Sequence, residues 1–221
     1  LRGKGVTRFH AVYWPAMLLS ARQPLPTQIY VHDYLTVDGN RISKSGGTSV
    51  DPIDLVERFG VDPLRWWLLR EVPRVGDTDF TIERLAARTN TDLANGLGNL
   101  VNRVVSMVHR YRDGVVPGAD GSPGAVAKPL VQALDQVPAL VDAALADFDF
   151  RAATGAVWAV VEAANRFVND TRPWLLAKAE AGGDPAAGTE LDAVLRRLVE
   201  AGRTLAGELA PFLPVAAPRI E

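Results

Sequence analysis

Residues 93 to 107 read Leu-Ala-Asn-Gly-Leu-Gly-Asn-Leu-Val-Asn-Arg-Val-Val-Ser-Met, and their pattern is the strongest indication of the fold class. Large apolar residues recur at intervals of three and four, so on a helix they would form one stripe along a single side. Such a stripe is stable in water only when other elements cover it. The stretch therefore predicts one long amphipathic helix inside a helical assembly, with a stripe formed by Leu93, Leu97, Leu100, Val104 and Met107.

The sequence after this helix predicts more helices of the same kind. A Gly- and Pro-rich segment over 113–124 is typical of a loop. Three amphipathic stretches follow it, at 126–147, 149–180 and 187–213. Ala-Gly-Gly-Asp-Pro at 181–185 separates the last two. Short links between long amphipathic helices favour an antiparallel bundle, so we expect residues 86–221 to form one.

The pattern upstream of the bundle is mixed. Residues 1–50 predict an α/β piece with a helix over 6–20. Residues 27–37 mix β-branched and aromatic side chains and end at Asp38-Gly39, which predicts a strand followed by a turn.

Residues 51–85 are predicted to connect this α/β piece to the bundle. Asp51 and Asp62 each precede a proline, the arrangement of an N-cap before the first helical position, so two short helices should begin there. The second helix carries Trp66 and Trp67, which we expect to pack and to link the two halves.

The segment after the Asp38-Gly39 turn reads Arg41-Ile42-Ser43-Lys44-Ser45. An ammonium on a long stem between two hydroxyl groups can stabilise the negative charge that moves as a triphosphate is cleaved. The same residues are also ordinary for a solvated hairpin tip. The loop taken alone leaves both interpretations open.

Composition narrows the possible classes of protein. The 221 residues are 48% apolar, enough for one large core or two modest ones, and the net charge of −2 creates no global attraction for nucleic acid. The absence of cysteine excludes disulfides and thiolate zinc sites, and the three histidines lack the spacing of metal ligands. No apolar run approaches the roughly 20 residues that span a bilayer, and no signal peptide is evident. We expect a cytoplasmic protein that binds no metal and no membrane.

Several short motifs occur together in the first 50 residues. They are Gly3-Lys4-Gly5, Phe9-His10, Trp14-Pro15-Ala16, Val31-His32-Asp33-Tyr34 and the Arg41–Ser45 loop. In this order they resemble the second half of the catalytic domain of class I aminoacyl-tRNA synthetases, specifically the methionyl-tRNA synthetase family. That family has G-K-D, F-H, W-P-A, V-H-G-Y and K-M-S-K-S at the corresponding places. The resemblance implies that residues 1–50 are the C-terminal remnant of a Rossmann-type α/β catalytic domain with a KMSKS-like loop.

The resemblance also implies a reaction. The complete enzyme would activate methionine with ATP, release pyrophosphate and transfer the acyl group to tRNA(Met), with Mg²⁺ entering with ATP. Lys44 would stabilise the phosphate charge in the transition state, aided by Ser43, Ser45 and Arg41.

Four upstream residues would belong to the substrate sites of that enzyme. Gly3 matches a glycine whose backbone approaches the nucleotide, although a plain turn glycine is the alternative. Phe9, His10 and Trp14 match positions that shape the methionine pocket. His10 and Trp14 stand four apart and could hold a thioether from one helical face, but a core aromatic cluster is equally compatible with them.

The helical half carries a second set of matching residues. Asn99 and Arg103 stand four residues apart, on one face of the long helix, and Pro173-Trp174 lies far downstream. By resemblance these residues recognise the CAU anticodon, with Asn99 and Arg103 on base edges and Trp174, positioned by Pro173, stacked on a base. A solvated Asn/Arg face and a core tryptophan are the alternative for either element alone.

The sequence departs from the family pattern at several places. Gly5 replaces an aspartate, Arg41 and Ile42 replace the first Lys and the Met of the signature, and Gly46 stands where a basic residue is common. The H-I-G-H segment and the zinc-knuckle insertion of the family are not in these 221 residues. We therefore expect this chain alone to be inactive and to need an N-terminal catalytic half, in cis or in trans.

Two other functions stay open at this stage. The chain could be a split or degenerate paralogue that binds tRNA or a protein without catalysis. It could also belong to a synthetase-derived ligase with another acceptor, although that enzyme would not need the residues of the anticodon face.

Overall fold

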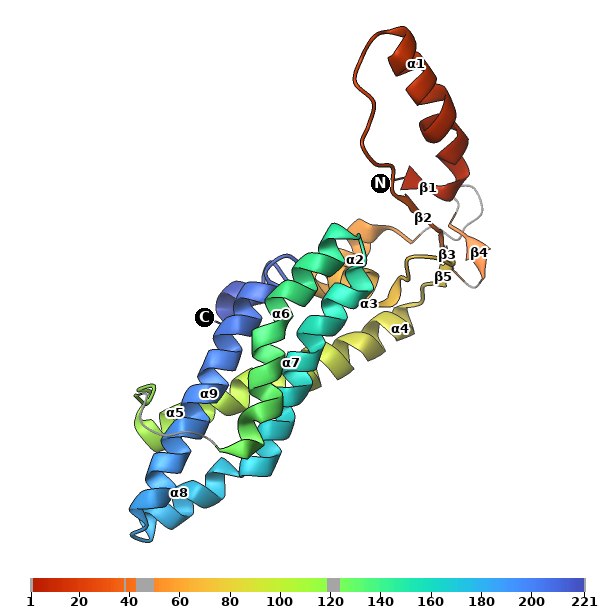
Figure 1. Cartoon of the computed structure of the whole chain (residues 1–221). Coiled ribbons are helices and arrows are strands. Elements are labelled where there is room, and N and C mark those ends of the chain that lie inside the picture. The colour runs from red at the N-terminus through yellow and green to blue at the C-terminus, as the bar shows by residue number, and fades with distance from the viewer. Residues whose placement is uncertain (1, 38, 43–49, 119–123, 221) are drawn as a thin grey trace.

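The computed structural model describes residues 2–37, 39–42, 50–118 and 124–220 of an elongated, mostly helical molecule (Figure 1). A small β region and one isolated helical segment lie at one end, and long helices packed side by side form the rest. None of the helices in the described residues combines the length and the apolar character that a membrane span requires.

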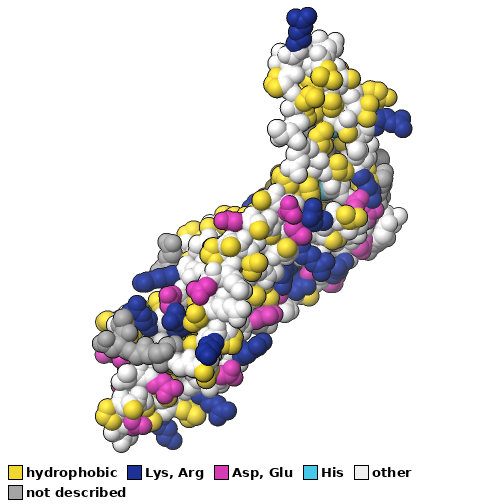
Figure 2. All heavy atoms as spheres, in the orientation of Figure 1, with side chains coloured by type: hydrophobic (Ala, Val, Ile, Leu, Met, Phe, Trp, Pro, Cys, Tyr) yellow, Lys and Arg dark blue, Asp and Glu magenta, His cyan; other side chains and the backbone are white. Residues whose placement is uncertain are grey.

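The N-terminal helical segment extends away from the body of the molecule (Figure 1). It runs through a 3₁₀ turn, Lys4–Val6, a π-helical turn, Phe9–Tyr13, and α1, Trp14–Ser20. None of these elements contains a buried residue. Apolar side chains therefore gather on the surface of this end of the molecule (Figure 2).

The strand predicted over 27–37 is wrong as one element, because two short strands replace it. β2, Val31–His32, pairs in parallel with β1, Arg2–Gly3. β3, Leu35–Val37, belongs to a different sheet. The break falls at Asp33 and Tyr34. The Asp33 carboxylate accepts a hydrogen bond from the Gly76 N–H and the Tyr34 N–H donates to the Asp77 carboxylate, while the Tyr34 carbonyl accepts from the Thr78 N–H.

β3 is the central strand of the second sheet. It pairs antiparallel with β4, Asn40–Arg41, across the predicted turn, and in parallel with β5, Thr78–Asp79. The strand order is β4-β3-β5. β5 precedes the long helix of the bundle, so this sheet joins the signature hairpin directly to the helical half.

Two connecting helices follow the hairpin. α2, Pro52–Phe59, begins as predicted, because the Asp51 carboxylate accepts a hydrogen bond from the Ile53 N–H at 2.8 Å. α3, Val61–Glu71, begins after Gly60 instead of at Asp62, so the predicted second N-cap is wrong. The Asp62 carboxylate instead accepts hydrogen bonds from the backbone N–H groups of Val215 and Ala216, which ties α3 to the C-terminal turns.

The two tryptophans of α3 enter two different hydrophobic cores. Trp67 packs in a small core beneath the sheet, with its ring at 88° to that of Phe80. Trp66 packs in the core of the bundle and lies beside Trp158. Both side chains are almost fully buried, with Trp66 1% and Trp67 0% exposed, which agrees with the predicted linking role.

A single long helical run forms the first element of the bundle. It consists of α4, Ile82–Arg88, a π-helical stretch, Thr89–Gly98, and α5, Asn99–Arg112. Thr81 caps it by accepting a hydrogen bond from the Arg84 N–H. The predicted apolar stripe is confirmed, since its members are buried or packed against the core.

The remaining helices pack around this run. They are α6, Lys128–Ala146, α7, Phe150–Thr171, α8, Pro173–Ala181, and α9, Pro185–Leu209, with 3₁₀ turns at Ala125–Ala127 and Ala217–Arg219. The core between them is fully closed around residues such as Val157 and Leu195, both 0% exposed. The single helix predicted over 149–180 is wrong, because it divides at Arg172.

Candidate functional site

The break between α7 and α8 creates an exposed tryptophan. Arg172 adopts the left-handed conformation, with φ 47° and ψ 61°, and Pro173 opens α8. Proline disfavours the continuation of a helix, because it lacks an N–H and its ring clashes with the preceding turn, and it is favoured at the first position of a new one. Pro173 is buried, whereas Trp174 is 43% exposed. The turn therefore presents an indole on the surface although its neighbour anchors in the core.

Arg103 of α5 meets this tryptophan. The Arg103 Cζ atom lies 6.0 Å from the centre of the Trp174 ring, a cation–π distance. The Arg103 Nη2 group also donates a hydrogen bond of 3.3 Å to the Asn169 Oδ1 atom on α7. Asn99 is exposed one helical turn before Arg103. Helices from distant parts of the sequence thus bring three of the predicted residues to one surface.

Asn169 is the contact that the sequence-based reasoning missed. The sequence patterns indicated a role only for the Pro173-Trp174 pair that follows it. The available signal was spacing, since Asn169 stands four residues before Pro173, one turn ahead of the helix break.

The residues predicted to shape a methionine pocket form an exposed aromatic face. The His10 and Trp14 rings lie 6.2 Å apart at 70°, and those of Phe9 and Tyr13 lie 5.5 Å apart. Phe9 is 60% exposed and Trp14 is 39% exposed, so a buried core cluster is excluded for them in this structure. Gly3 lies in β1 opposite His32, and a methyl group there would meet the His32 ring at an ordinary 3.7 Å.

The signature loop leaves the sheet from a hairpin that an aspartate holds. Ser43, Lys44 and Ser45 lie outside the described residues, as does the side chain of Arg41. The backbone of Arg41, in β4, pairs with Thr36 of β3. The Asp79 Oδ1 atom accepts hydrogen bonds from the Gly39 N–H at 2.9 Å and from the Thr36 hydroxyl at 2.7 Å. Both hydrogen bonds lower the pKa of Asp79, and the one from Gly39 has the larger effect.

A lysine bound by two carboxylates connects the N-terminal segment to the residues before β5. The Lys4 Nζ atom lies 2.5 Å from Asp77 and 3.0 Å from Asp33. These contacts raise the pKa of Lys4, with the hydrogen bond to Asp77 as the larger cause. Hydrogen bonds from the Gly76 N–H and then from Lys4 lower the pKa of Asp33. Lys4 and Asp33 therefore keep their charges near neutral pH.

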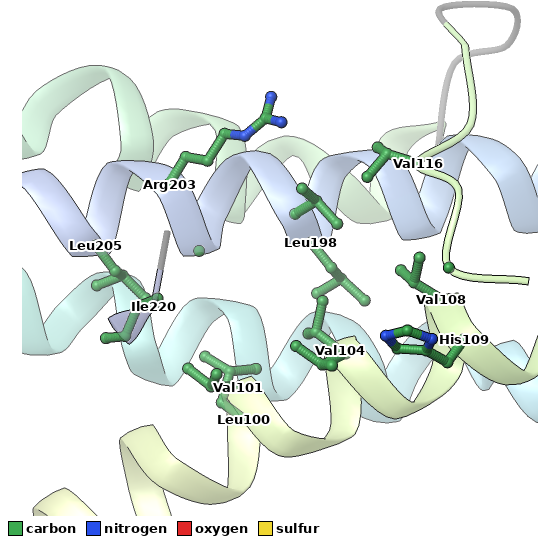
Figure 3. A pocket seen from close by; sticks show the side chains of 14 residues that line it. Leu100, Val101, Val104, Val108, His109, Val116, Leu198, Arg203, Leu205 and Ile220 are labelled. Atoms are coloured by element: carbon green, nitrogen blue, oxygen red, sulfur yellow. The ribbon is translucent and has the colours of Figure 1, made fainter. Parts of the chain in front are cut away.

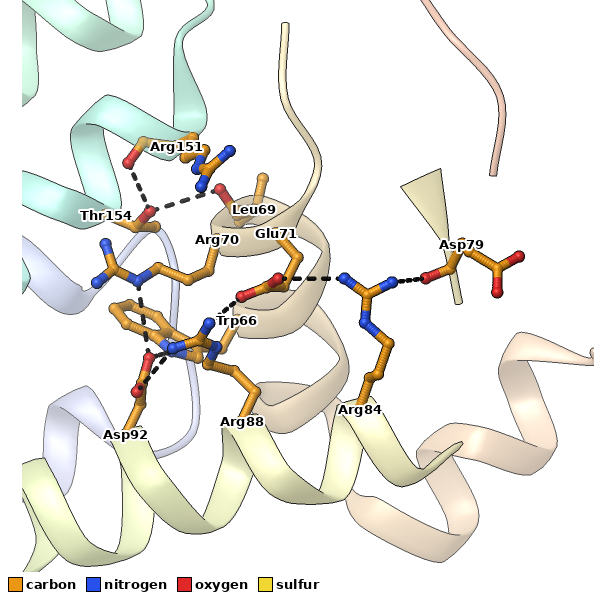
Figure 4. Close-up of polar contacts among 10 residues, drawn as sticks. All are labelled: Trp66, Leu69, Arg70, Glu71, Asp79, Arg84, Arg88, Asp92, Arg151 and Thr154. Carbon is orange, nitrogen blue, oxygen red and sulfur yellow. Dashed lines mark hydrogen bonds and ion pairs between the residues drawn. The ribbon is translucent and has the colours of Figure 1, made fainter. Parts of the chain in front are cut away.

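A chain of ion pairs continues from the hairpin into the bundle (Figure 4). Arg84 donates to the Asp79 backbone carbonyl at 2.5 Å and pairs with Glu71, which also binds Arg88. Arg88 in turn lies 3.3 Å from Asp92.

Asp92 ends this chain in the core. Its carboxylate is 2% exposed and accepts a hydrogen bond of 3.0 Å from the Trp66 indole N–H, with Arg70 at 3.7 Å. A buried carboxylate of this kind is stable only when it is paired and hydrogen-bonded. The network therefore fixes α3 against the long helical run.

Comparison with known proteins identifies the family. A family described as tRNA synthetases class I (M) matches residues 1–105. The chain is 40% identical over 213 residues to methionine–tRNA ligase of Bacillus subtilis, covering 96% of the chain and 31% of that protein. It is 42% identical to methionine–tRNA ligase of Brucella suis, in an alignment that covers 99% of this chain and 41% of that protein.

Solved structures agree with this assignment. Methionyl-tRNA synthetase of Mycobacterium tuberculosis in complex with methionyl-adenylate matches 99% of the chain, with a TM-score of 0.92 and 38% identity. The apo form of the same synthetase matches with a TM-score of 0.88. The chain belongs to the class I methionyl-tRNA synthetase family. It spans about a third of the length of the Bacillus relative and 42% of the matched Mycobacterium chain.

One departure from the methionyl-tRNA synthetase pattern has a clear structural counterpart. At Gly5, where the family has aspartate, a Cβ atom would lie 2.1 Å from the Tyr34 hydroxyl. An aspartate at position 5 would therefore require the Tyr34 side chain to move. The carboxylates beside Lys4 are those of Asp77 and Asp33, and Asp33 occupies the glycine position of the V-H-G-Y pattern.

The described residues contain no ready-made metal site. No group of three His, Cys, Asp or Glu side chains there is arranged to hold an ion.

Proposed function

We propose that this chain is part of a methionine–tRNA ligase, an enzyme of protein biosynthesis in the cytoplasm. The complete enzyme activates methionine with ATP and Mg²⁺ and transfers it to tRNA(Met). We assign residues 1–50 to the C-terminal half of a Rossmann-type catalytic domain, 51–85 to connecting helices that contact the tRNA stem, and 86–221 to an anticodon-binding bundle.

The contact between Arg103 and Trp174 carries the proposal for the bundle. Bases of a single-stranded loop are recognised by stacking on aromatic rings and by amide and guanidinium groups on their edges. Trp174 supplies an exposed ring, Arg103 a guanidinium 6.0 Å from it, and Asn99 an exposed amide one turn away. This combination suits the CAU anticodon, with Trp174 stacked on one base and Pro173 fixing its position.

The proposal for the catalytic half is electrostatic. Lys44, with Ser43, Ser45 and Arg41, would neutralise the phosphate charge that develops as pyrophosphate leaves, which accelerates the step without covalent chemistry. The hairpin held by Asp79 supports a fixed starting point for this loop. Gly3 would lie near the nucleotide, and Phe9, His10 and Trp14 would line the methionine site.

The exposed aromatic face of residues 9–14 supports the need for a further catalytic half. Aromatic and aliphatic side chains that are half exposed here would be covered when the rest of a catalytic domain packs on them. On this proposal the described residues alone do not form adenylate, whether that half is supplied in cis or in trans. The family's zinc knuckle would lie in that part of the enzyme.

Binding of the chain to tRNA tests the first proposal. Filter binding should show preference for tRNA(Met) over the same tRNA with a changed anticodon, and Trp174→Ala should abolish that preference. Equal binding of both tRNAs by the unaltered chain would contradict the assignment of the bundle.

The second proposal is tested in a ligase with a complete catalytic domain. Lys44→Ala should slow ATP–pyrophosphate exchange by at least tenfold with little change in the KM for methionine, because the lysine acts in the transition state. Trp174→Ala is the matched control, since it should leave exchange intact. Unchanged exchange in Lys44→Ala would refute the role of the loop.

A further inference from the structure

A groove of about 280 Å³ lies between α5 and α8, next to the proposed anticodon residues. Its walls belong to two rows of side chains on α5 and to Trp174 on α8. One row consists of Asn102, Ser106 and Arg110, and the other of Arg103, Met107 and Tyr111. Residues four apart lie above one another on a helix, so the groove runs along α5 away from Asn99. Only Arg103 and Trp174 are shared with the site proposed above.

The lining has the chemistry of a base-binding pocket. Met107 is 9% exposed and supplies an apolar floor, and the half-buried Tyr111 and the exposed Trp174 add aromatic surface. Asn102 and Ser106 are exposed at the rim and offer hydrogen-bond donors and acceptors. Small-molecule sites combine an apolar interior with a few polar groups in this way.

Arg110 gives the groove a positive end. Its neighbour Arg112 is held by Asp192 and Glu180, at 2.5 and 3.1 Å. By contrast, no carboxylate among the described residues lies within ion-pair distance of the exposed Arg110 guanidinium, which lies 5.8 Å from the Tyr111 ring. An exposed guanidinium of this kind is suited to a phosphate group.

We infer that this groove is a second nucleotide subsite for single-stranded RNA. It accepts the base of a loop nucleotide adjacent to the one stacked on Trp174, and Arg110 binds a phosphate of that nucleotide. The inference rests on the proposed function, since it extends the anticodon surface by one position along α5. It assigns roles to Asn102, Ser106 and Arg110 that the sequence patterns did not indicate.

The test uses the 221-residue chain and an RNA hairpin carrying the anticodon loop of tRNA(Met). Binding is measured by fluorescence polarisation over a range of salt concentrations. Arg110→Ala should weaken binding several-fold and reduce the slope of log K against log salt by about 0.7, the effect of one lost phosphate contact on a single strand. Arg203→Ala on α9 is the matched control, because it removes an exposed arginine that lines a different groove (Figure 3).

A second variant maps the base. Ser106→Leu fills the groove from an exposed helical position and should weaken binding of the intact hairpin about tenfold, as expected for one lost stacked base. A set of hairpins, each with one abasic nucleotide in the loop, identifies the base concerned. When one particular loop position is abasic, Ser106→Leu should no longer weaken binding. When the neighbouring position is abasic, Trp174→Ala should no longer weaken binding.

The outcomes separate the two proposals. The subsite is overturned if Arg110→Ala behaves like Arg203→Ala, or if Ser106→Leu weakens all abasic hairpins equally. If Arg103→Ala and Trp174→Ala reduce binding in that case, the anticodon surface stands and only the extension fails. If none of these four variants affects binding, the proposed function of the bundle fails with it.

Discussion

Asp92→Ala should be among the most destabilising single substitutions in the chain. The substitution removes a carboxylate that is 2% exposed and that pairs with Trp66, Arg70 and Arg88. The Trp66 indole N–H, in a residue that is 1% exposed, would lose its hydrogen bond to the Asp92 carboxylate, at a cost of about 1–3 kcal/mol. Arg70 would lose the anion that offsets its burial, and burial already lowers the pKa of Arg70. Arg88 contributes less, because it is a third exposed and keeps Glu71.

Together these losses predict a destabilisation of about 3–4 kcal/mol, in the range for breaking a buried pair from one side. For a chain of this size that corresponds to a fall in Tm of roughly 10 °C. Urea and thermal unfolding followed by circular dichroism measure it. Glu200→Ala is the control, since it deletes a carboxylate that is 52% exposed and pairs with Arg197 across one turn, worth less than about 1 kcal/mol. If Asp92→Ala costs no more than Glu200→Ala, the account of the network is refuted.

Two further predictions concern a glycine and a charge. Gly96→Ala should destabilise the chain by about 1–3 kcal/mol in urea unfolding, because the new methyl group would lie 2.3 Å from the Trp158 ring. The control Gly207→Ala meets no atom within 4 Å and should stabilise the chain by about 0.5–1 kcal/mol. Similar effects of the two substitutions would contradict the close packing of Trp158 on Gly96. Hydrogen bonds from a backbone N–H and from Lys4 lower the pKa of Asp33, so its stabilising effect is present above the unfolded pKa of about 4 and is lost as pH falls through the folded value. The difference in urea midpoint between the unaltered chain and Asp33→Asn should therefore be constant from about pH 7 to 5 and shrink below about pH 4; a difference independent of pH would show that the charge of Asp33 has no part in it.

The helical half was predictable because its pattern is local. Spacing alone located the long run and its buried stripe, and Asp51 acted as the cap that its position before proline suggests. Expectations failed where a residue serves a distant partner. Asp62 does not cap α3, because its carboxylate accepts hydrogen bonds from the backbone near the other end of the chain.

The candidate site was predictable to a similar degree. Arg103 and Trp174 were selected from motifs, and the structure brings them to one surface. Asn169 and the groove residues were not found, because their relation to Trp174 depends on the angle at which α8 leaves α7. That angle is set at Arg172. The left-handed backbone conformation of Arg172 cannot be predicted from the helical periodicity of the sequence.

The consecutive tryptophans of α3 have a mechanical consequence. Trp66 and Trp67 are adjacent in one helix yet belong to separate cores, so α3 cannot turn about its axis without disturbing both. The β3–β4 hairpin at one end of the molecule and the α7–α8 break in the bundle are therefore held at a constant distance and orientation, because α3 acts as a rigid spacer instead of a hinge. Insertion of a single alanine between the two tryptophans would offset one end by about 100° relative to the other.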